Sequence, residues 1–460
     1  MIRKSGREST GCWKWSDRLV SRTMFEISEK AKMVTGALLV SVHLARESAD
    51  EAQSLLDELE ALVDTLGVPV RGKMLVKIIK PQAQMYVGTG KAAEIWDHAK
   101  ELGLDVIVFD NELTPAQQRN WEALSGMAVI DRQEVILDIF NNRAHTREAR
   151  LQVDLARMEY SLPRLTRAWS HLSKQGGGIG GKGEGESQLE TDKRLVRKQI
   201  DRIKDDLIKV RAQRATQRKS RVRLPLPNAA IVGYTNAGKS SLLKKLTGAD
   251  VLVEDKLFAT LDTTTRKIEL PNSQALLLTD TVGFVRKLPH RLVEAFKATL
   301  EEAVLADFLI HVLDASHPEV LNFHQTTLKV LEELHADGKR MITAFNKIDA
   351  VTEESQKIFL RKHFPDALFI SAQTGEGLDE LRQHCMEMLA DRTQRSELII
   401  PLDRSDLLAQ LHEKGNVLTT SYEDDGIHVQ AMVPSAWQAK FAPYLEVAEP
   451  GLVEAEAMGS

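Results

Sequence analysis

The sequence predicts an α/β protein whose central domain is a mostly parallel sheet with helices on both faces. Three observations predict this class. Apolar runs alternate with amphipathic stretches over residues 35–140, which is the pattern of strands joined by helices. An apolar run at 228–232 leads through a glycine-rich loop into the helical stretch LLKKL, and a second run, at 342–345, ends in the polar residues NKID. Such sheets bind ligands at the carboxyl ends of their strands, so we expect the functional site there.

Length and composition narrow the class of protein. A chain of 460 residues is too long for one ordinary core and predicts about three domains. The 43% hydrophobic and 28% charged fractions are typical of a soluble globular protein. No run approaches the roughly 18 apolar residues of a membrane span. Only Cys12 and Cys385 are present, which argues against a disulfide framework or a cysteine metal site and favours the cytoplasm.

The composition changes along the chain and indicates five parts. The first 23 residues are basic and lack the apolar run of a secretory signal. We interpret them as part of a disordered tail or as the product of an upstream start codon, with an organelle transit peptide as the alternative. The five parts are a tail at 1–34, an N-terminal α/β domain at 35–142, a basic helical hairpin with a glycine-rich tip at 143–224, a nucleotide-binding domain at 225–397 and a small C-terminal α/β domain at 398–460.

A glycine-rich stretch in the N-terminal domain could be mistaken for a phosphate loop. Residues 85–95 read MYVGTGKAAEI, but they lack the four-residue spacing between glycines and the Ser or Thr after lysine. A tight turn from a strand into a helix explains Gly88 and Gly90, and it leaves Lys91 exposed. We therefore expect no nucleotide site in this domain.

Two heptad-like series predict the helical hairpin. Apolar positions recur at alternating three and four residues from Leu151 to Leu172, with a kink expected at Pro163, and again from Leu189 to Val210. Two helices with matching seams pair naturally. The segment 174–192 between them is rich in glycine, so we expect either a flexible connector or a finger that becomes ordered against a partner.

The returning helix of this hairpin is strongly cationic. Residues 193–223 contain thirteen Lys and Arg but only three Asp, a net charge of +10 in a chain whose total is −5. This charge indicates contact with RNA phosphates, the alternative being a solvated charged face. There is no row of aromatic residues for base stacking. The candidate contact residues are Lys182, Lys193, Arg194, Arg197 and Lys198.

The loop after the strand at 228–232 is a phosphate-binding motif. It reads Gly233-x4-Gly238-Lys239-Ser240, in which the backbone N–H groups surround phosphates, the lysine supplies positive charge and the serine hydroxyl ligates Mg²⁺. The strand before it and the helix after it give the context that this motif requires. The candidate nucleotide contacts are Gly233, Tyr234, Thr235, Asn236, Ala237, Gly238, Lys239, Ser240 and Ser241.

A second cluster predicts which base is bound. The strand at 342–345 ends in Asn346, Lys347 and Asp349. A carboxylate at this place accepts bonds from the ring N–H and the exocyclic amine of guanine, whereas adenine would leave it unpaired. In FISAQTG, at 369–375, Ser371 and Ala372 are small enough for the backbone to approach the base. We therefore expect GTP in preference to ATP.

Two further segments complete the expected site. In LLLTDTVGF a buried strand delivers Asp280, expected to hold Mg²⁺ through water, and the N–H of Gly283 is expected to bond the γ-phosphate. In KLFATLDTTTRKIEL the magnesium-ligating threonine is one of four, Thr260, Thr263, Thr264 and Thr265. In this order the four elements predict a P-loop GTPase domain. One departure is that Phe284 follows Gly283 where a glutamine would orient the attacking water.

These motifs resemble one family. GGGIG followed by GEGESQLETDKR, then GYTNAGKSS, LFATLDTTTR, DTVGF and NKID, is similar to the HflX family of ribosome-associated GTPases, in the Obg-HflX group, over roughly residues 35–450. The usual family tip, GPGESQLE or GPGETQLE, has Glu184 here in place of proline. That change adds charge and puts the rigidity of the tip in doubt.

The resemblance implies a function. It implies binding to the large ribosomal subunit, splitting of stalled or idle ribosomes by the GTP-bound form, and a hairpin that reaches toward the peptidyl-transferase centre. Similarity to the Obg proteins favours Thr260 as the magnesium-ligating threonine, so the catalytic candidates are Lys239, Thr260 and Gly283. Nothing in the sequence demands more than a monomer. The alternative function is a GTP-gated RNA-binding or scaffold protein in which hydrolysis is incidental.

The hydrophobic residue at 284 implies that hydrolysis has another source of help. GTPases of this kind rely on groups outside that position. Asn236 lies where similar phosphate loops bind K⁺ in place of an arginine finger, although an asparagine that stabilises the loop is an equal alternative. The ribosome could also order the mobile segments and supply charge. Slow turnover without ribosomes follows from either source.

Overall fold

The computed structural model describes residues 35–165, 184–221, 226–248, 257–258, 260–261, 263–272, 274–287, 302–389, 393–414, 416–434 and 437–445. The predicted tail at 1–34 and most of the glycine-rich tip lie outside these residues. The chain forms two compact units. The first comprises residues up to 210 together with two short segments, 252–262 and 282–300. The second comprises 211–251, 263–281 and the remainder from 301 onward.

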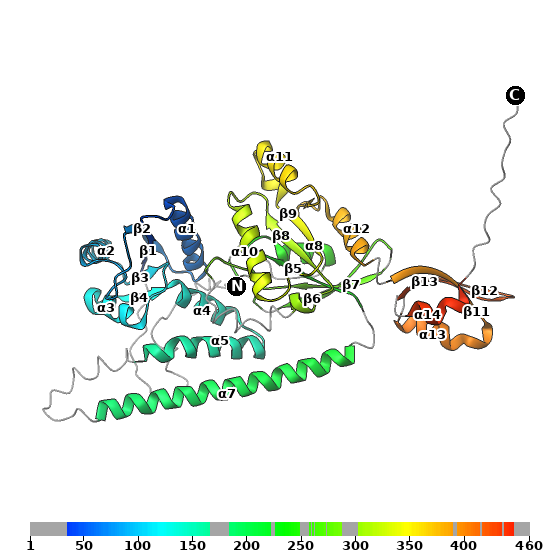
Figure 1. The fold of residues 1–460 in the computed structure, drawn as a ribbon, viewed down its shortest axis with the longest axis horizontal. Coiled ribbons are helices and arrows are strands. Elements are labelled where there is room, and N and C mark those ends of the chain that lie inside the picture. The colour runs from blue at the N-terminus through cyan, green and yellow to red at the C-terminus, as the bar shows by residue number, and fades with distance from the viewer. Residues whose placement is uncertain are drawn as a thin grey trace, which may run out of the picture. The chain divides into compact units, whose positions relative to one another are not determined.

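A parallel four-stranded sheet in the order β2-β1-β3-β4 forms the core of the first unit. Its strands are β1 (Ala37–Leu44), β2 (Val70–Ile78), β3 (Val106–Phe109) and β4 (Ala128–Asp131), and its helices are α1 (Ala49–Thr65), α2 (Thr89–Glu101) and α3 (Pro115–Ser125) (Figure 1). Trp121 of α3 is fully buried against Phe109 of β3, with 5.0 Å between ring centroids. Gly88 precedes α2, and Lys91 forms an exposed ion pair with Glu94.

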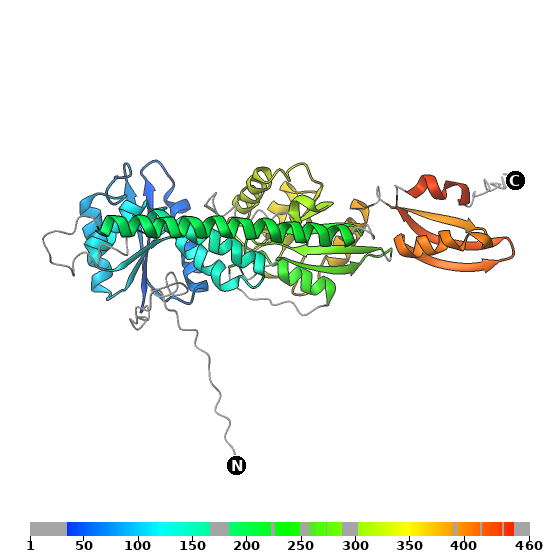
Figure 2. The same ribbon diagram turned by 90° about the horizontal axis from the view of Figure 1, so that it is seen from below.

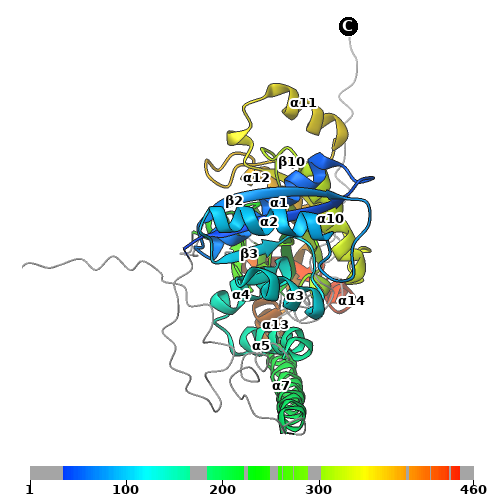
Figure 3. The same cartoon turned by 90° about the vertical axis from the view of Figure 1, so that its left-hand side faces the viewer.

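The helical part of this unit begins after the sheet. Its elements are α4 (Arg132–Arg143), α5 (Arg147–Ser161), a short 3-10 helix (Leu162–Arg164) and the long α7 (Glu184–Arg221), of which the residues from 211 onward group with the second unit. α5 and α7 lie side by side (Figures 2 and 3), and Lys204 pairs with Glu159 at 2.8 Å. Pro163 lies in the 3-10 turn that ends α5.

The predicted seam of α7 is buried from Ile200 to Val210, whereas Val196 is half-buried and the side chain of Leu189 lies outside the described residues. Ile200, Ile203, Leu207 and Val210 are all less than 10% exposed. The seam predicted for α5 is only half-buried, and its fully buried face is a different one, formed by Ala149, Gln152, Val153, Ala156 and Tyr160. The heptad pattern assumed a single partner for α5, whereas this helix also packs against α4.

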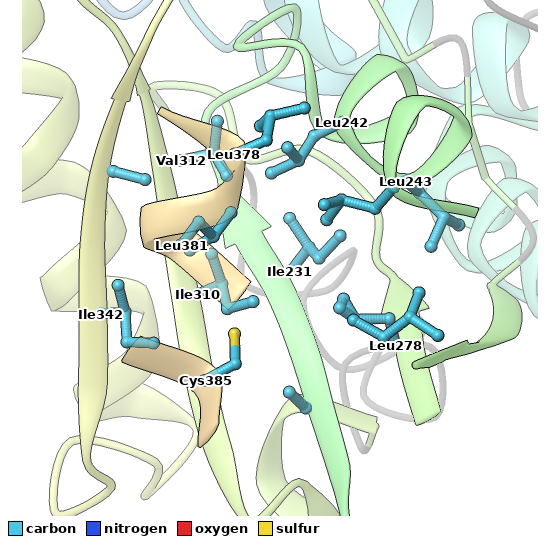
Figure 4. Packing of buried hydrophobic residues seen from close by; sticks show 14 of the residues in the cluster. Ile231, Leu242, Leu243, Leu278, Ile310, Val312, Ile342, Leu378, Leu381 and Cys385 are labelled. Atoms are coloured by element: carbon cyan, nitrogen blue, oxygen red, sulfur yellow. The ribbon is translucent and has the colours of Figure 1, made fainter. Parts of the chain in front are cut away.

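A six-stranded sheet in the order β10-β9-β8-β5-β7-β6 forms the core of the second unit. Its strands are β5 (Asn228–Gly233), β6 (Thr264–Glu269), β7 (Ala275–Asp280), β8 (Phe308–Asp314), β9 (Met341–Asn346) and β10 (Leu368–Phe369). Only the pairing of β6 with β7 is antiparallel. The helices are α8 (Lys239–Thr247), α10 (Val320–Glu333), α11 (Glu354–His363) and α12 (Leu378–Met388). Figure 4 shows Ile231, Leu243, Ile310 and Leu381 converging from both strands and helices on one core.

The C-terminal part combines a three-stranded antiparallel sheet with two helices. The strands are β11 (Thr393–Ile400), β12 (Asn416–Glu423) and β13 (Gly426–Pro434), in the order β11-β13-β12, and the helices are α13 (Ser405–Lys414) and α14 (Gln438–Phe441). It has its own core around Leu398, Leu411 and Phe441. Among the helices described in the structure, none is long and apolar enough to cross a membrane.

A buried histidine lies in β8, beside Val232 of β5. His311 of β8 is fully buried and stacks on His324 of α10, with ring centroids 5.1 Å apart. Among the described residues, neither ring nitrogen of His311 has a hydrogen-bond partner. Burial lowers the pKa of His311 to about 3, with smaller contributions from His324 and Lys239. The ring is therefore neutral in the folded protein at physiological pH.

We expect replacement of His311 by leucine to make the folded protein less sensitive to acid. In the unfolded chain His311 becomes protonated below its ordinary pKa of 6.5. In the folded protein the ring stays neutral until the pH approaches its lowered pKa of about 3. As the pH decreases between these two values, His311 therefore lowers the free energy of unfolding by about 1.4 kcal/mol per pH unit. Urea unfolding at pH 7.5 and pH 5.5 measures the difference. The exposed His363→Leu variant should behave as the wild type, and equal acid losses in all three proteins would exclude this role.

Candidate functional site

The phosphate loop runs from the end of β5 to the start of α8. Gly233 and Gly238 bound it, with φ angles of 146° and 90° that disfavour other residues. A Cβ atom on Gly233 would lie 2.2 Å from the carbonyl oxygen of Val312, and one on Gly238 would lie 2.2 Å from Nδ2 of Asn346. Both glycines are therefore required by the close approach of β8 and β9.

Lys239, the first residue of α8, is buried beneath this loop. Its ammonium group donates to the carbonyl oxygen of Tyr234 at 2.8 Å. Burial lowers the pKa of Lys239 to about 8, and the charge of Asp280 partly opposes that shift. A desolvated cation at the amino end of a helix favours an anion, because phosphate oxygens would restore the solvation that the ammonium has lost.

Two oxygen ligands meet at the start of α8. Ser240 Oγ donates to Asp280 Oδ2 at 2.5 Å. The end of β7 is held beside β5 by the hydroxyl of Thr281, which donates to the carbonyl oxygen of Ile231 at 2.7 Å. A hydroxyl and a carboxylate are hard oxygen donors of the kind that Mg²⁺ takes beside nucleotide phosphates. The residues present therefore fit Mg²⁺.

Asn346, the last residue of β9, joins the two loops of the predicted base site to the phosphate loop. Its Nδ2 donates to the carbonyl oxygen of Ala237 at 2.9 Å, and its Oδ1 accepts from the N–H of Ala372 at 2.9 Å. Ser371 is fully buried, and its hydroxyl accepts from the N–H of Thr374 at 3.0 Å. One side chain thus fixes the spacing between the expected phosphate and base contacts.

The two residues that follow Asn346 differ in what they contact. Lys347 has a left-handed φ of 62°, and its ammonium group pairs with Asp314 Oδ2 at 2.8 Å. Asp349 is exposed, so its carboxylate is accessible to a ligand. Asp314 was missed from the sequence, although its place at the carboxyl end of β8 was a usable signal.

The remaining residues of the phosphate loop show how it is supported. Thr235 and Ala237 are buried, Ser241 is half-buried, and Asn236 is exposed with a left-handed φ of 59°. The ring of Tyr234 stacks on Phe323 of α10, with centroids 3.8 Å apart. Sequence reasoning missed this stack because the two residues are far apart in the chain.

The structure places the four candidate threonines differently. Thr264 and Thr265 belong to β6, where Thr265 Oγ1 lies 2.9 Å from Thr279 Oγ1. Thr260 and Thr263 precede the strand and are half-buried. Thr260 falls in the segment 252–262, and Gly283 falls in the segment 282–300, both of which group with the first unit. The phosphate loop, Asp280 and the two base loops thus belong to the second unit, whereas Thr260 and Gly283 group with the first.

The predicted RNA contacts lie on α7. Arg194, Arg197 and Lys198 are exposed, and Lys193 is half-buried. Lys182 lies outside the described residues. The buried seam begins at Ile200, so the exposed cations occupy the part of α7 next to the glycine-rich tip.

The parallel sheet, the phosphate loop, Asp280 and the two base loops define a P-loop GTPase. Family models match three consecutive regions of the chain. They are described as GTP-binding GTPase N-terminal (residues 53–141), GTP-binding GTPase Middle Region (143–221) and 50S ribosome-binding GTPase (228–347).

Curated relatives match nearly the whole chain. GTPase HflX of Akkermansia muciniphila is 54% identical over 434 residues, which cover 92% of this chain and 99% of the relative. GTPase HflX of Escherichia coli is 40% identical and covers 86% and 93%. The chain belongs to the HflX family of GTPases, as its motifs predicted, and hydrolyses GTP. A solved GTP-binding protein from Sulfolobus solfataricus, in complex with GDP, is 24% identical with a TM-score of 0.42, and the match covers 77% of this chain and 98% of that one.

We expect nucleotide binding to be coupled to proton uptake by Lys239. In the free protein its pKa is about 8, and phosphate oxygens should raise it because they favour the charged form. Binding of GDP should therefore take up a proton near pH 8, and the affinity should fall above that pH by up to about tenfold per unit. Titration calorimetry at pH 7.0 and pH 8.5, in two buffers of different ionisation enthalpy, measures the uptake. The Lys239→Arg variant should show none, and absence of uptake by the wild type would contradict the prediction.

Proposed function

We propose that this GTPase binds the large ribosomal subunit and, in its GTP-bound form, splits stalled or idle ribosomes in the cytoplasm. The observation that carries the proposal is the composition of the first unit. That unit contains both the exposed cations of α7 and the described residues Thr260 and Gly283. An element suited to RNA and the segments expected to sense the γ-phosphate thus belong to one body. The matched family description, a 50S ribosome-binding GTPase, agrees with this partner.

The exposed cations of α7 suit RNA phosphates rather than base edges. Arginine and lysine near phosphates release condensed counterions, so binding should weaken as salt is added. The described part of α7 offers no row of aromatic residues on which bases could stack. Binding through this face should therefore follow charge and shape.

We propose the following roles for residues of this chain in binding the nucleotide and its metal ions. Ser240 and Thr260 would ligate Mg²⁺, and Asp280 would hold it through water. Bound Mg²⁺ would neutralise charge that develops on the phosphates. Lys239 would supply a cation at the β- and γ-phosphates, and the Gly283 N–H would bond the γ-phosphate. The exposure of Asn236 leaves it accessible to a K⁺ ion, and comparison of potassium with sodium buffer separates this role from support of the loop.

We expect purified large ribosomal subunits to stimulate GTP turnover strongly. The Arg194→Glu/Arg197→Glu variant should bind subunits about tenfold more weakly, with a shallower dependence on salt, because phosphate contacts are lost. The matched control is Lys329→Glu/Lys362→Glu, which makes the same charge change at exposed positions on α10 and α11. Turnover assays and sedimentation of ribosomes with a non-hydrolysable GTP analogue measure both steps.

Three outcomes separate the functions. Stimulation, together with conversion of whole ribosomes to subunits, supports the proposal. Equal losses in the two charge variants would remove α7 from the binding surface. Absence of both binding and stimulation would leave a GTP-gated RNA-binding or scaffold protein, and the ribosomal function would be withdrawn.

A further inference from the structure

A cluster of five charged residues, three of them buried, contacts the segment that follows Gly283. We call Glu58, Asp110, Arg132, Arg286 and Lys287 the anchor cluster. Arg132 donates from Nη1 to Glu58 Oε1 at 3.0 Å and from Nε to Asp110 Oδ1 at 2.7 Å. Arg286 donates from Nε to Glu58 Oε2 at 2.7 Å, and Lys287 donates from Nζ to Asp110 Oδ2 at 2.7 Å. All five belong to the first unit.

The charges of this cluster do not balance without Arg286 and Lys287. The side chains of Asp110, Arg132 and Glu58 are 0%, 3% and 7% exposed. Two buried carboxylates thus face one guanidinium from the sheet and helices of this unit. In each carboxylate one oxygen bonds Arg132 and the other bonds Arg286 or Lys287. If both Arg286 and Lys287 were displaced, Arg132 alone would leave one buried negative charge uncompensated, so the cluster favours the conformation in which these cations are in place.

The backbone around the two cations is fixed as well. Arg286 Nη2 donates to Ser54 Oγ at 2.9 Å and to its carbonyl oxygen at 3.2 Å. Arg132 Nη1 reaches the carbonyl oxygen of Arg286 at 3.5 Å. Lys287 has a left-handed φ of 54°, which a residue with a side chain adopts only when its surroundings enforce it. The cluster thus sets the path of the chain and not only the position of two side chains.

The path of the chain through Val282–Lys287 affects hydrolysis because this segment contains Gly283. Gly283, whose N–H we expect at the γ-phosphate, is three residues before Arg286. Phe284 and Val285 between them are buried, and Phe284 offers no group to orient water. Such a site depends on how well the segment is ordered, and ordering a free residue costs roughly 1–2 kcal/mol. Order that exists before GTP arrives lowers that cost.

We propose that Glu58, Asp110 and Arg132 are positioning residues for GTP hydrolysis. They act through Arg286 and Lys287 to hold Val282–Lys287 in the conformation that places Gly283. The proposal concerns turnover without ribosomes and does not rest on the ribosomal function. The competing explanation is that the ion pairs only stabilise the fold.

The Arg286→Met variant tests the proposal directly. It leaves Glu58 and Asp110 both bonded to Arg132, so neither carboxylate becomes an unpaired buried charge. We expect kcat for GTP in the absence of ribosomes to fall about tenfold. The KM for GTP and the affinity for GDP should change less than about twofold, because GDP has no γ-phosphate. The Arg286→Lys variant retains a cation for Glu58 and should recover most of the rate.

A matched control removes a different cation, Lys73 of β2, which pairs with carboxylates of α1. Lys73 pairs with Asp57 at 3.0 Å and Glu60 at 2.8 Å, on an exposed face of α1, the helix that carries Glu58. Lys73→Met should leave kcat unchanged. An equal fall in Lys73→Met would show that the effect comes from the stability of α1, and it would overturn the proposal.

A double-mutant cycle identifies the interaction responsible. Glu58→Gln should lower kcat about as much as Arg286→Met does, and the combined variant should be no slower than the slower single one. Additive losses would mean that the two residues act separately. An unchanged or raised kcat in Arg286→Met would also overturn the proposal.

Discussion

A buried excess of negative charge in the first unit constrains the chain after Gly283. Glu58 and Asp110 share Arg132, and each keeps one oxygen for a cation that arrives from Arg286 or Lys287. Because desolvated carboxylates need such partners, they favour the conformation in which the residues after Thr281 group with the first unit. The segment expected to report the γ-phosphate therefore groups with the first unit, which also contains α7 up to Val210.

A second constraint shapes the nucleotide site. Asn346 bonds both the phosphate loop and the loop at 371–372, and it lies so close to Gly238 that no Cβ fits there. The expected phosphate and base contacts are thus set at a fixed spacing before a ligand binds, which is the kind of preorganisation that hydrolysis requires. In a GTPase with Phe284 in place of glutamine, the same demand falls on the segment after Gly283, where the anchor cluster supplies order.

The sequence predicted the parts whose chemistry is local. The HflX motifs, the mostly parallel sheet and the seam of α7 from Ile200 to Val210 follow from residues close together in the chain, and the structure and relatives confirm them. The anchor cluster could not be predicted in this way, because Arg286 and Glu58 are 228 positions apart and each resembles an ordinary surface charge. The buried face of α5 was missed because a heptad pattern does not reveal a second partner. Thr260 as the magnesium ligand and Lys182 as an RNA contact stay predictions.

Hydrogen exchange of the amides in Val282–Lys287 tests the central claim most directly, because it reports whether this segment is ordered before GTP binds. We expect slow exchange in the nucleotide-free wild-type protein and faster exchange in Arg286→Met, with the core of β5 unchanged between them. Exchange as fast as that of an unstructured peptide in the nucleotide-free wild type would contradict it, since the anchor cluster would then not hold the segment in solution.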